Sequence, residues 1–170
     1  MITASIILAE AAVLYENMNA VQSQVYGPAA RGGAARSDVL ISEKTIDFPK
    51  VTHPNVLVCL TQTAYNMYNP IIRPGSLLIT DSRYVKTESK VDARQRELPL
   101  YATVMEKIGN PIVFNICVLG ALIALTDVVK PQSVVSVLSS RVPENFLDMN
   151  RYALDLGLEI GRGAKQIKKD

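Results

Sequence analysis

Two uninterrupted apolar runs constrain the fold of this chain most strongly: "NVLVCL" from Asn55 and "LLIT" from Leu77. Neither run alternates apolar with polar residues, which is typical of strands covered on both faces, as in parallel sheets. The segment between them, "TQTAYNMYNPI" from Thr61, is predicted to be a helix that ends at Pro70. A strand, a helix and another strand in this order indicate a three-layer α/β/α domain with a mostly parallel central sheet.

The rest of the pattern extends this arrangement. Apolar spacing predicts a mostly buried helix over residues 4–17, with Thr3 as its N-cap. Further strands are predicted at 19–25, 37–42 and, as the last strand, 98–104. Further helices are predicted at 111–126 and from Pro131, because proline is tolerated in a first turn. A final amphipathic helix is predicted at 144–164. The charged stretch 84–97 has no clear period and is predicted to be an exposed connection.

The order of elements raises a question about the start of the sheet. A doubly wound domain opens with a strand, a glycine-rich turn and then a helix. This sequence begins directly at the helix. We therefore hypothesise that the native polypeptide is longer and that its first strand precedes Met1.

Composition limits the number of domains and the kinds of partner. A chain of 170 residues that is 48% hydrophobic supports one core, so a single domain is predicted over 1–170. The net charge of +2 comes from 18 basic and 16 acidic side chains spread along the chain, which argues against nucleic-acid binding. The longest apolar run is shorter than the roughly 18 residues that a membrane span needs. Cys59 and Cys117 lie in apolar runs without CxxC spacing, as expected for reduced thiols of a cytoplasmic protein.

The segment "QVYGPAARGGAARSDV" is the strongest candidate for a binding site. Gly27 and the following proline set a turn, and Gly32 and Gly33 allow backbone conformations in which consecutive N–H groups converge on an anion. Arg31 and Arg36 flank the glycine pair with planar, permanently charged guanidinium groups. Together these residues describe a cradle for a phosphate or a carboxylate.

A structural interpretation of the same segment remains open. In it, Arg31 or Arg36 pairs with Asp38 or Glu43, and the loop binds no ligand. Tyr26 adjoins the loop, where it is either a packing residue or an anchor for a subunit interface. The residues alone favour the structural interpretation, because glycine and arginine in a loop form a weak motif.

Polar residues also follow the two apolar strands, where parallel sheets present their ligands. Thr61, Gln62 and Thr63 follow the first strand, and Asp81 and Ser82 follow the second. Gln62 is a candidate binding residue. The alternative for the other four is that they cap helix starts or close turns, which their side chains do well without a ligand.

Two residues interrupt the apolar helix predicted at 111–126. Asn115 needs a hydrogen-bond partner if it is buried, and it is therefore a candidate subunit contact. Gly120 is predicted to allow close packing of a neighbouring helix. No nucleophile, acid–base pair or metal cluster emerges, and His53, the only histidine, has no natural partner. This pattern favours a non-catalytic subunit over a self-sufficient enzyme.

Five segments, taken in order, resemble one known family: "TASIILAEAA", "YGPAARGGAARSDVLIS", "PNVLVCLTQTAY", "PGSLLITDS" and "GNPIVFNICVLGALIAL". They are similar to the gamma subunit of 2-oxoacid:ferredoxin oxidoreductases, and most similar to that of the 2-oxoglutarate enzymes. The resemblance covers nearly the whole chain. The strand and glycine-rich turn that precede "TASIILAEAA" in the family are absent.

The resemblance implies a complex that decarboxylates a 2-oxoacid oxidatively, forms an acyl-CoA and passes electrons to ferredoxin. Thiamine diphosphate, Mg and iron–sulfur clusters are then expected in alpha, beta and ferredoxin-like delta partner subunits, with coenzyme A as co-substrate and no cofactor held by this chain alone. Six residues become candidates for contact with coenzyme A: Gly27, Arg31, Gly32, Gly33, Arg36 and Gln62. The alternatives are a pyruvate or branched-chain 2-oxoacid enzyme, a purely structural assembly module, and a free-standing nucleotide-binding domain.

Overall fold

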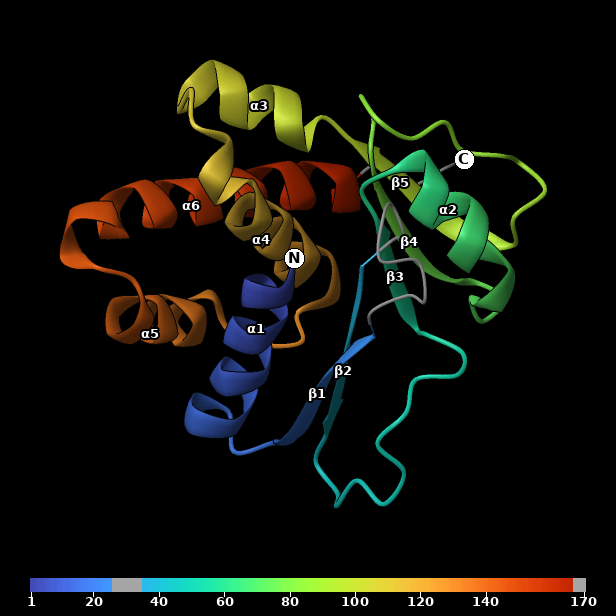
Figure 1. The fold of residues 1–170 in the computed structure, drawn as a ribbon, viewed down its shortest axis with the longest axis horizontal. Helices are drawn as coiled ribbons and strands as arrows, with labels where there is room; N and C mark the ends of the chain where they lie inside the picture. Colours follow the sequence, from blue (N-terminus) through green and yellow to red (C-terminus); the bar gives the residue numbers. More distant parts are fainter. Residues whose placement is uncertain (26–34, 167–170) are drawn as a thin grey trace.

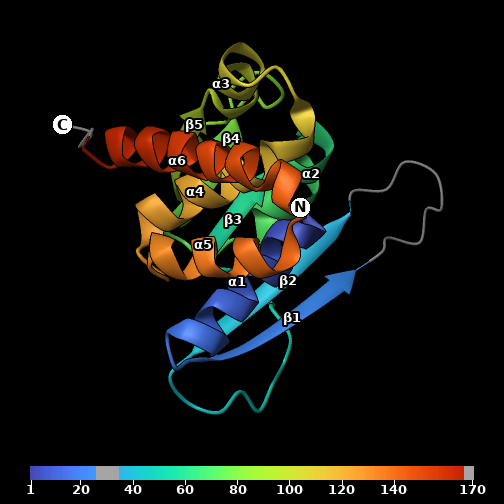
Figure 2. The ribbon, with the colours of Figure 1, turned by 90° about the vertical axis from the view of Figure 1, so that its left-hand side faces the viewer.

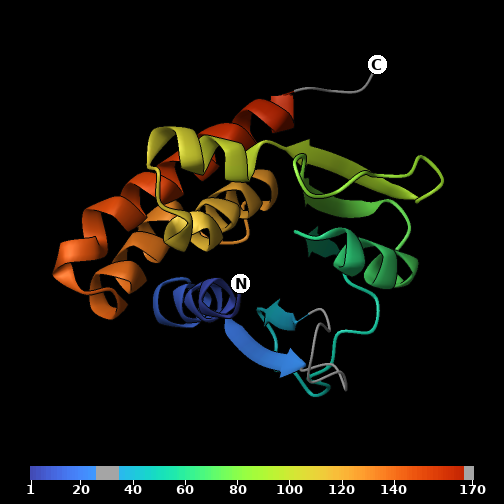
Figure 3. The same cartoon turned by 45° about the horizontal axis from the view of Figure 1, so that its top comes forward.

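A parallel sheet forms the centre of the computed structural model, which describes residues 1–25 and 35–166 (Figure 1). Its strands are β3 (Val56–Cys59), β4 (Ser76–Asp81) and β5 (Ala93–Leu98), in the order β3-β4-β5. Helix α2 (Gln62–Tyr68) covers one face, and α4 (Phe114–Thr126) and α6 (Glu144–Gln166) cover the other (Figure 3). The predicted three-layer α/β/α arrangement with a parallel sheet is confirmed.

The N-terminal part forms a separate sheet. Helix α1 (Ile2–Tyr15) leads through a turn at Asn17, whose φ is positive, into β1 (Asn19–Val25). Strand β1 pairs antiparallel with β2 (Arg36–Ser42), and α1 packs along this hairpin (Figure 2). Both strands were expected, but their pairing was not. The predicted N-cap at Thr3 is wrong, because the helix already begins at Ile2 with Met1 in the cap position.

The remaining helices and turns connect these layers. They are η1 (Asn69–Ile71), α3 (Leu100–Lys107), η2 (Pro111–Val113) and α5 (Pro131–Arg141). Both predicted proline starts are confirmed, since Pro111 opens η2 directly before α4 and Pro131 opens α5. No helix within the described ranges combines the length and the apolar character needed to cross a membrane.

Helices α4 and α6 pack unusually closely because glycines face each other across their contact. A Cβ on Gly120 would lie 2.3 Å from the carbonyl oxygen of Leu154, and one on Gly157 would lie 2.0 Å from that of Cys117. Such distances leave no room for a side chain. The predicted role of Gly120 in close helix packing is confirmed.

Two predictions between residues 84 and 104 are wrong. Strand β5 begins within the stretch 84–97, which was expected to be an exposed connection, and ends one residue beyond it. Its sequence is charged because it is an edge strand, where polar side chains meet water. The segment predicted as the last strand is instead helix α3. Leu100 and Val104 are buried at helical i, i+4 spacing, and the carboxylate of Asp81 accepts a hydrogen bond from the first-turn N–H of Tyr101 at 2.7 Å.

The two cysteines lie in separate apolar clusters and are fully buried. Burial raises the pKa of each thiol to about 12; for Cys117 the charge of Asp81 adds to the effect. Because the thiolate is the reactive form, we expect iodoacetamide at about pH 8 to modify neither cysteine in the folded protein and both after unfolding. Intact mass spectrometry measures the added mass, and rapid labelling of the native protein would contradict this placement.

Candidate functional site

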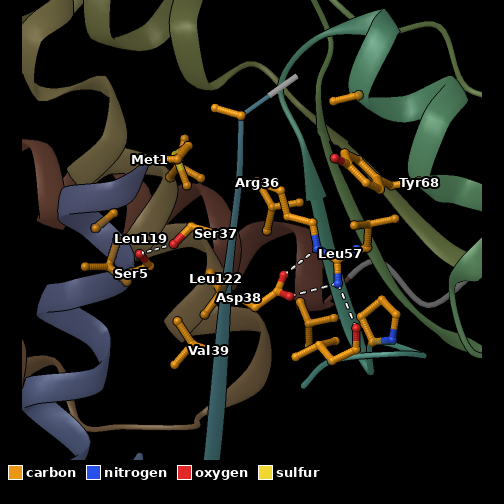
Figure 4. A pocket seen from close by; sticks show the side chains of 18 of the residues that line it. Met1, Ser5, Arg36, Ser37, Asp38, Val39, Leu57, Tyr68, Leu119 and Leu122 are labelled. Atoms are coloured by element: carbon orange, nitrogen blue, oxygen red, sulfur yellow. Dashed lines mark hydrogen bonds and ion pairs between the residues drawn. The ribbon is translucent and has the colours of Figure 1, made fainter. Parts of the chain in front are cut away.

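A groove runs between β2 and β3 and contains the only arginine of the predicted anion cradle that lies in the described residues (Figure 4). Its lining comes from α1, β2, β3, α2 and α4, and most of it is apolar. Figure 4 shows Ser37 of β2 directed toward Ser5 of α1, and Arg36 and Asp38 directed toward Leu57 of β3. The groove therefore has two walls that belong to different sheets.

Arg36 is held firmly at the start of β2. Its Nε and Nη2 donate to the two carboxylate oxygens of Asp38 at 2.7 and 2.8 Å, and Nη2 also donates to the carbonyl oxygen of Val51 at 2.7 Å. The guanidinium carbon lies 5.4 Å from the ring centroid of Tyr68. The hydrogen bonds to Asp38 raise the pKa of Arg36.

The pairing of Arg36 with Asp38 matches the structural interpretation of this residue. Three N–H donors of the guanidinium are committed to protein acceptors, so Arg36 joins β2 to the segment that precedes β3. The other candidates of the cradle, Tyr26, Gly27, Arg31, Gly32 and Gly33, lie outside the described residues. The ends of their segment are held side by side, because Val25 and Arg36 are partners in the hairpin register.

Gln62 lies at the start of α2, as expected, but its amide is engaged by the protein. Its Oε1 accepts from the N–H of Lys86 at 2.8 Å, and its Nε2 donates to Oδ1 of Asn66 at 2.9 Å. Thr61 accepts from the N–H of Ala64 and caps α2. Gln62 thus ties α2 to the segment that follows β4. Neither Thr61 nor Gln62 is among the described residues that line the groove.

Asp81 has a structural task at the carboxyl end of β4. The residue is fully buried, and its carboxylate accepts from the N–H of Arg83 at 2.9 Å and from that of Tyr101 at 2.7 Å. It therefore closes the turn after β4 and caps α3. Of the two interpretations of Asp81, the structural one, in which it closes a turn and caps a helix, is confirmed.

An aromatic cluster beside Asp81 escaped the sequence analysis. Tyr101 makes edge-to-face contacts with Tyr84 and Phe114, with ring centroids 5.1 and 5.4 Å apart, respectively. The guanidinium of Arg83 lies over both tyrosines. Tyrosine and arginine are enriched among the residues that contribute most of the binding energy in protein interfaces. No local signal could have revealed the cluster, because its members come from three separate segments.

Asn115 follows Phe114 in the first turn of α4. Its Oδ1 is buried and accepts no hydrogen bond from the described residues. A buried acceptor without a donor costs about 1–3 kcal/mol, so a donor from outside these residues would relieve a real penalty. The expected role of Asn115 as a subunit contact stays a prediction.

The described residues do not fit a metal or an iron–sulfur cluster. Within 1–25 and 35–166 no three side chains of histidine, cysteine, aspartate or glutamate come together at a distance suited to a metal ion. Cys59 and Cys117 are buried in different clusters, and their raised pKa values disfavour the thiolate form that clusters require.

Comparison with known proteins gives a consistent picture over nearly the whole chain. A family model described as pyruvate ferredoxin/flavodoxin oxidoreductase matches residues 1–160. The 2-oxoglutarate synthase subunit KorC of Methanocaldococcus jannaschii is 42% identical over 163 residues, which cover 95% of this chain and 87% of that protein. The subunit of the same name from Archaeoglobus fulgidus is 35% identical over 98% of this chain and 84% of that protein.

A solved structure supports the same relationship. The gamma subunit of a keto/oxoacid ferredoxin oxidoreductase from Geobacter sulfurreducens superimposes with a TM-score of 0.86 and 38% sequence identity. The match covers 96% of this chain and 92% of that one. The sequence comparison and the structural comparison therefore indicate the same family.

Proposed function

This chain belongs to the pyruvate ferredoxin/flavodoxin oxidoreductase family, and we propose that it is the gamma subunit of a 2-oxoglutarate:ferredoxin oxidoreductase complex. The complex decarboxylates 2-oxoglutarate oxidatively, transfers the acyl group to coenzyme A and passes the electrons to ferredoxin. The observation that carries the proposal is the similarity to 2-oxoglutarate synthase subunits along nearly the full length of both chains. The alternative is a pyruvate or branched-chain 2-oxoacid enzyme, and an assay with the three 2-oxoacids would distinguish it from the proposed function.

Within this complex we infer a supporting role for the chain. In this proposal, thiamine diphosphate, Mg and iron–sulfur clusters are bound by alpha, beta and ferredoxin-like delta partner subunits. The complex is proposed to be cytoplasmic. The surface formed by Arg83, Tyr84, Tyr101 and Phe114 supports an assembly role. Asn115, the next residue after Phe114, has a buried Oδ1 that accepts no hydrogen bond from the described residues. Rigid aromatic rings and a desolvated acceptor favour a contact with another subunit.

A more specific part of the proposal concerns the loop between β1 and β2. Since Arg36 is committed to Asp38, Arg31 with Gly32 and Gly33 is left as the cradle for an anion. We propose that this anion is a phosphate of coenzyme A. The competing possibility is an acidic edge of a partner subunit, which would make the loop an assembly element.

Kinetics of an Arg31→Ala variant in the assembled complex separate these two roles. We expect the KM for coenzyme A to rise about tenfold with kcat nearly unchanged, the size expected for one lost charge-assisted hydrogen bond. Arg162→Ala is the matched control, because it removes the same charge from the exposed surface of α6. Unchanged coenzyme A kinetics in an intact complex would contradict the coenzyme A contact, and loss of the complex would favour the assembly role.

Anaerobic purification tests the subunit assignment. A tagged copy of this chain, produced in its own cells, is expected to elute with larger subunits that mass spectrometry identifies as parts of the same oxidoreductase. Elution of the chain alone, under conditions in which related complexes survive, would argue against a role as a subunit.

A further inference from the structure

The guanidinium of Arg83 is exposed and has no hydrogen-bond acceptor among the described residues. Its contacts there are with two aromatic rings: the guanidinium carbon lies 5.8 Å from the ring centroid of Tyr84 and 5.4 Å from that of Tyr101. By contrast, Arg36 donates to the carboxylate of Asp38, and Arg141 is paired with Glu10. Arg83 therefore carries a positive charge that the described part of the chain leaves without an anionic partner.

The buried residue Asp81 fixes the arrangement around Arg83. One oxygen of its carboxylate accepts from the backbone N–H of Arg83 at 2.9 Å, and the other accepts from that of Tyr101 at 2.7 Å. The carbonyl oxygen of Asp81 accepts from the N–H of Tyr84 at 3.2 Å. The arginine and both tyrosines are thus anchored before any partner binds, which lowers the entropic cost of association.

A guanidinium over aromatic rings is well suited to bind a carboxylate. The cation–π contact uses the face of the group, whereas its N–H donors point outward in its plane. A carboxylate accepts two of these donors in parallel, which makes the pair both strong and specific in direction. The stacked side chain of Arg83 also has less conformational freedom to lose on binding than a mobile surface arginine.

Exposed apolar side chains accompany this charge. Tyr84 is 43% exposed, and Ile112, which precedes Phe114 by two residues, is 67% exposed. Met105 follows Tyr101 by four residues in α3, so both lie on the same face of that helix, and Met105 is exposed as well. A small anion would leave these side chains in water, whereas a protein surface covers them. Tyrosine, methionine and arginine are the residue types enriched at such interfaces.

We propose that Arg83, Tyr84, Tyr101 and Phe114 form a docking surface for another subunit of the complex, and that an aspartate or glutamate side chain of that subunit pairs with the guanidinium of Arg83. Charge complementarity identifies this occupant, because a carboxylate on a protein surface supplies both the missing acceptor and apolar neighbours for the exposed rings. The surface is separate from the groove, which none of these four residues lines. The inference rests on the proposed function as a subunit and adds the chemistry of the contact.

A cross-linking experiment on the Arg83→Lys variant tests the pairing directly. Lysine keeps the positive charge and supplies a primary amine, which a carbodiimide joins to a carboxylate in contact with it as an amide. The complex is purified from its own cells through the tagged variant and treated with the carbodiimide, and peptide mass spectrometry locates the amides. We expect an amide between the substituted position and an aspartate or glutamate of another subunit.

Arg73 provides the matched control. It is exposed, its side chain has no hydrogen-bond acceptor among the described residues, and it precedes β4, at the opposite end of the strand from Asp81. The Arg73→Lys variant is expected to give no amide to another subunit at the substituted position. If Arg83→Lys likewise formed amides only within its own chain, or none, the proposal would be overturned.

The affinity of the chain for the other subunits separates the ion pair from apolar packing. Arg83→Met keeps an apolar side chain but removes the charge, and it is expected to raise the Kd about ten- to a hundredfold. Arg83→Lys is expected to lose less affinity, and Arg73→Met none. Mass photometry of diluted complexes measures the Kd. Equal losses in Arg83→Met and Arg83→Lys would indicate apolar contact without a carboxylate and contradict the proposal.

Failure of this inference and failure of the proposed function give different results. An unchanged chain that elutes alone would contradict the assignment as a subunit, and the docking surface would be rejected with it. A complex that assembles with unchanged Kd from the Arg83→Met variant would leave the subunit assignment intact and overturn the docking surface. Thermal unfolding of each variant confirms that the fold is retained, since the side chain of Arg83 donates no hydrogen bond within the described residues.

Discussion

Gly157→Ala is expected to lower the free energy of unfolding by about 3 kcal/mol, the upper part of the range for overpacked cores. The new Cβ would lie 2.0 Å from the carbonyl oxygen of Cys117 and 3.0 Å from the backbone nitrogen of Ala121. Both are backbone atoms of α4, so no side-chain rotation can relieve the clash. The helices must separate, and the apolar surface between them loses contact.

The same helix provides a matched control. A Cβ on Gly163 of α6 would meet nothing within 4 Å, and alanine favours a helix over glycine by about 0.5–1 kcal/mol. Gly163→Ala is therefore expected to stabilise the protein slightly. Thermal unfolding followed by circular dichroism should show a Tm about 6–12 °C lower for Gly157→Ala and an equal or higher Tm for the control. Equal Tm values for Gly157→Ala and the unchanged protein would refute the close packing of α4 and α6.

Asp81→Ala is expected to lower the free energy of unfolding by about 2–3 kcal/mol. Each hydrogen bond to a charged acceptor contributes about 1.5–3 kcal/mol, and the contributions of the two hydrogen bonds at Asp81 are not fully additive because they share one carboxylate. The carboxylate is fully buried and serves the N–H groups of Arg83 and Tyr101. Without it, the turn after β4 loses its closure and α3 loses its N-terminal cap. The aromatic cluster, which includes Tyr84 and Tyr101, should loosen as well.

An exposed carboxylate of α6 is the control for charge. Asp148→Ala removes the same charge from the surface, where its effect is expected to stay within about 0.5 kcal/mol. Urea denaturation measures both variants at equal ionic strength. If Asp81→Ala and Asp148→Ala unfolded at the same urea concentration, the structural role assigned to Asp81 would be wrong.

The sequence predicted the parts of the fold in which apolar pattern and secondary structure coincide. The runs that became β3 and β4, the helix after Thr61 and the prolines that open η2 and α5 all carry local signals. The errors fall where tertiary contacts decide. Strand β5 lacks an apolar pattern because it is an edge, and α3 depends on the distant carboxylate of Asp81 for its first turn.

The candidate site was predicted less completely. Polar residues were correctly expected at the carboxyl ends of β3 and β4, but the sequence could not tell that Gln62 and Asp81 are already occupied by backbone N–H groups. The pairing of Arg36 with Asp38 could be predicted as an alternative because the two residues are close in sequence. The groove escaped prediction, since it is formed by segments from across the chain.

The assay of the purified complex tests the central claim most directly. Protein that elutes with the tagged chain under anaerobic conditions is given 2-oxoglutarate, pyruvate or 2-oxoisovalerate with a redox dye, in the presence and absence of coenzyme A. Dye reduction that depends on coenzyme A and is fastest with 2-oxoglutarate is the predicted result. Activity that prefers another of the three acids would contradict the substrate, and the absence of coenzyme A-dependent reduction with all three would contradict the function itself.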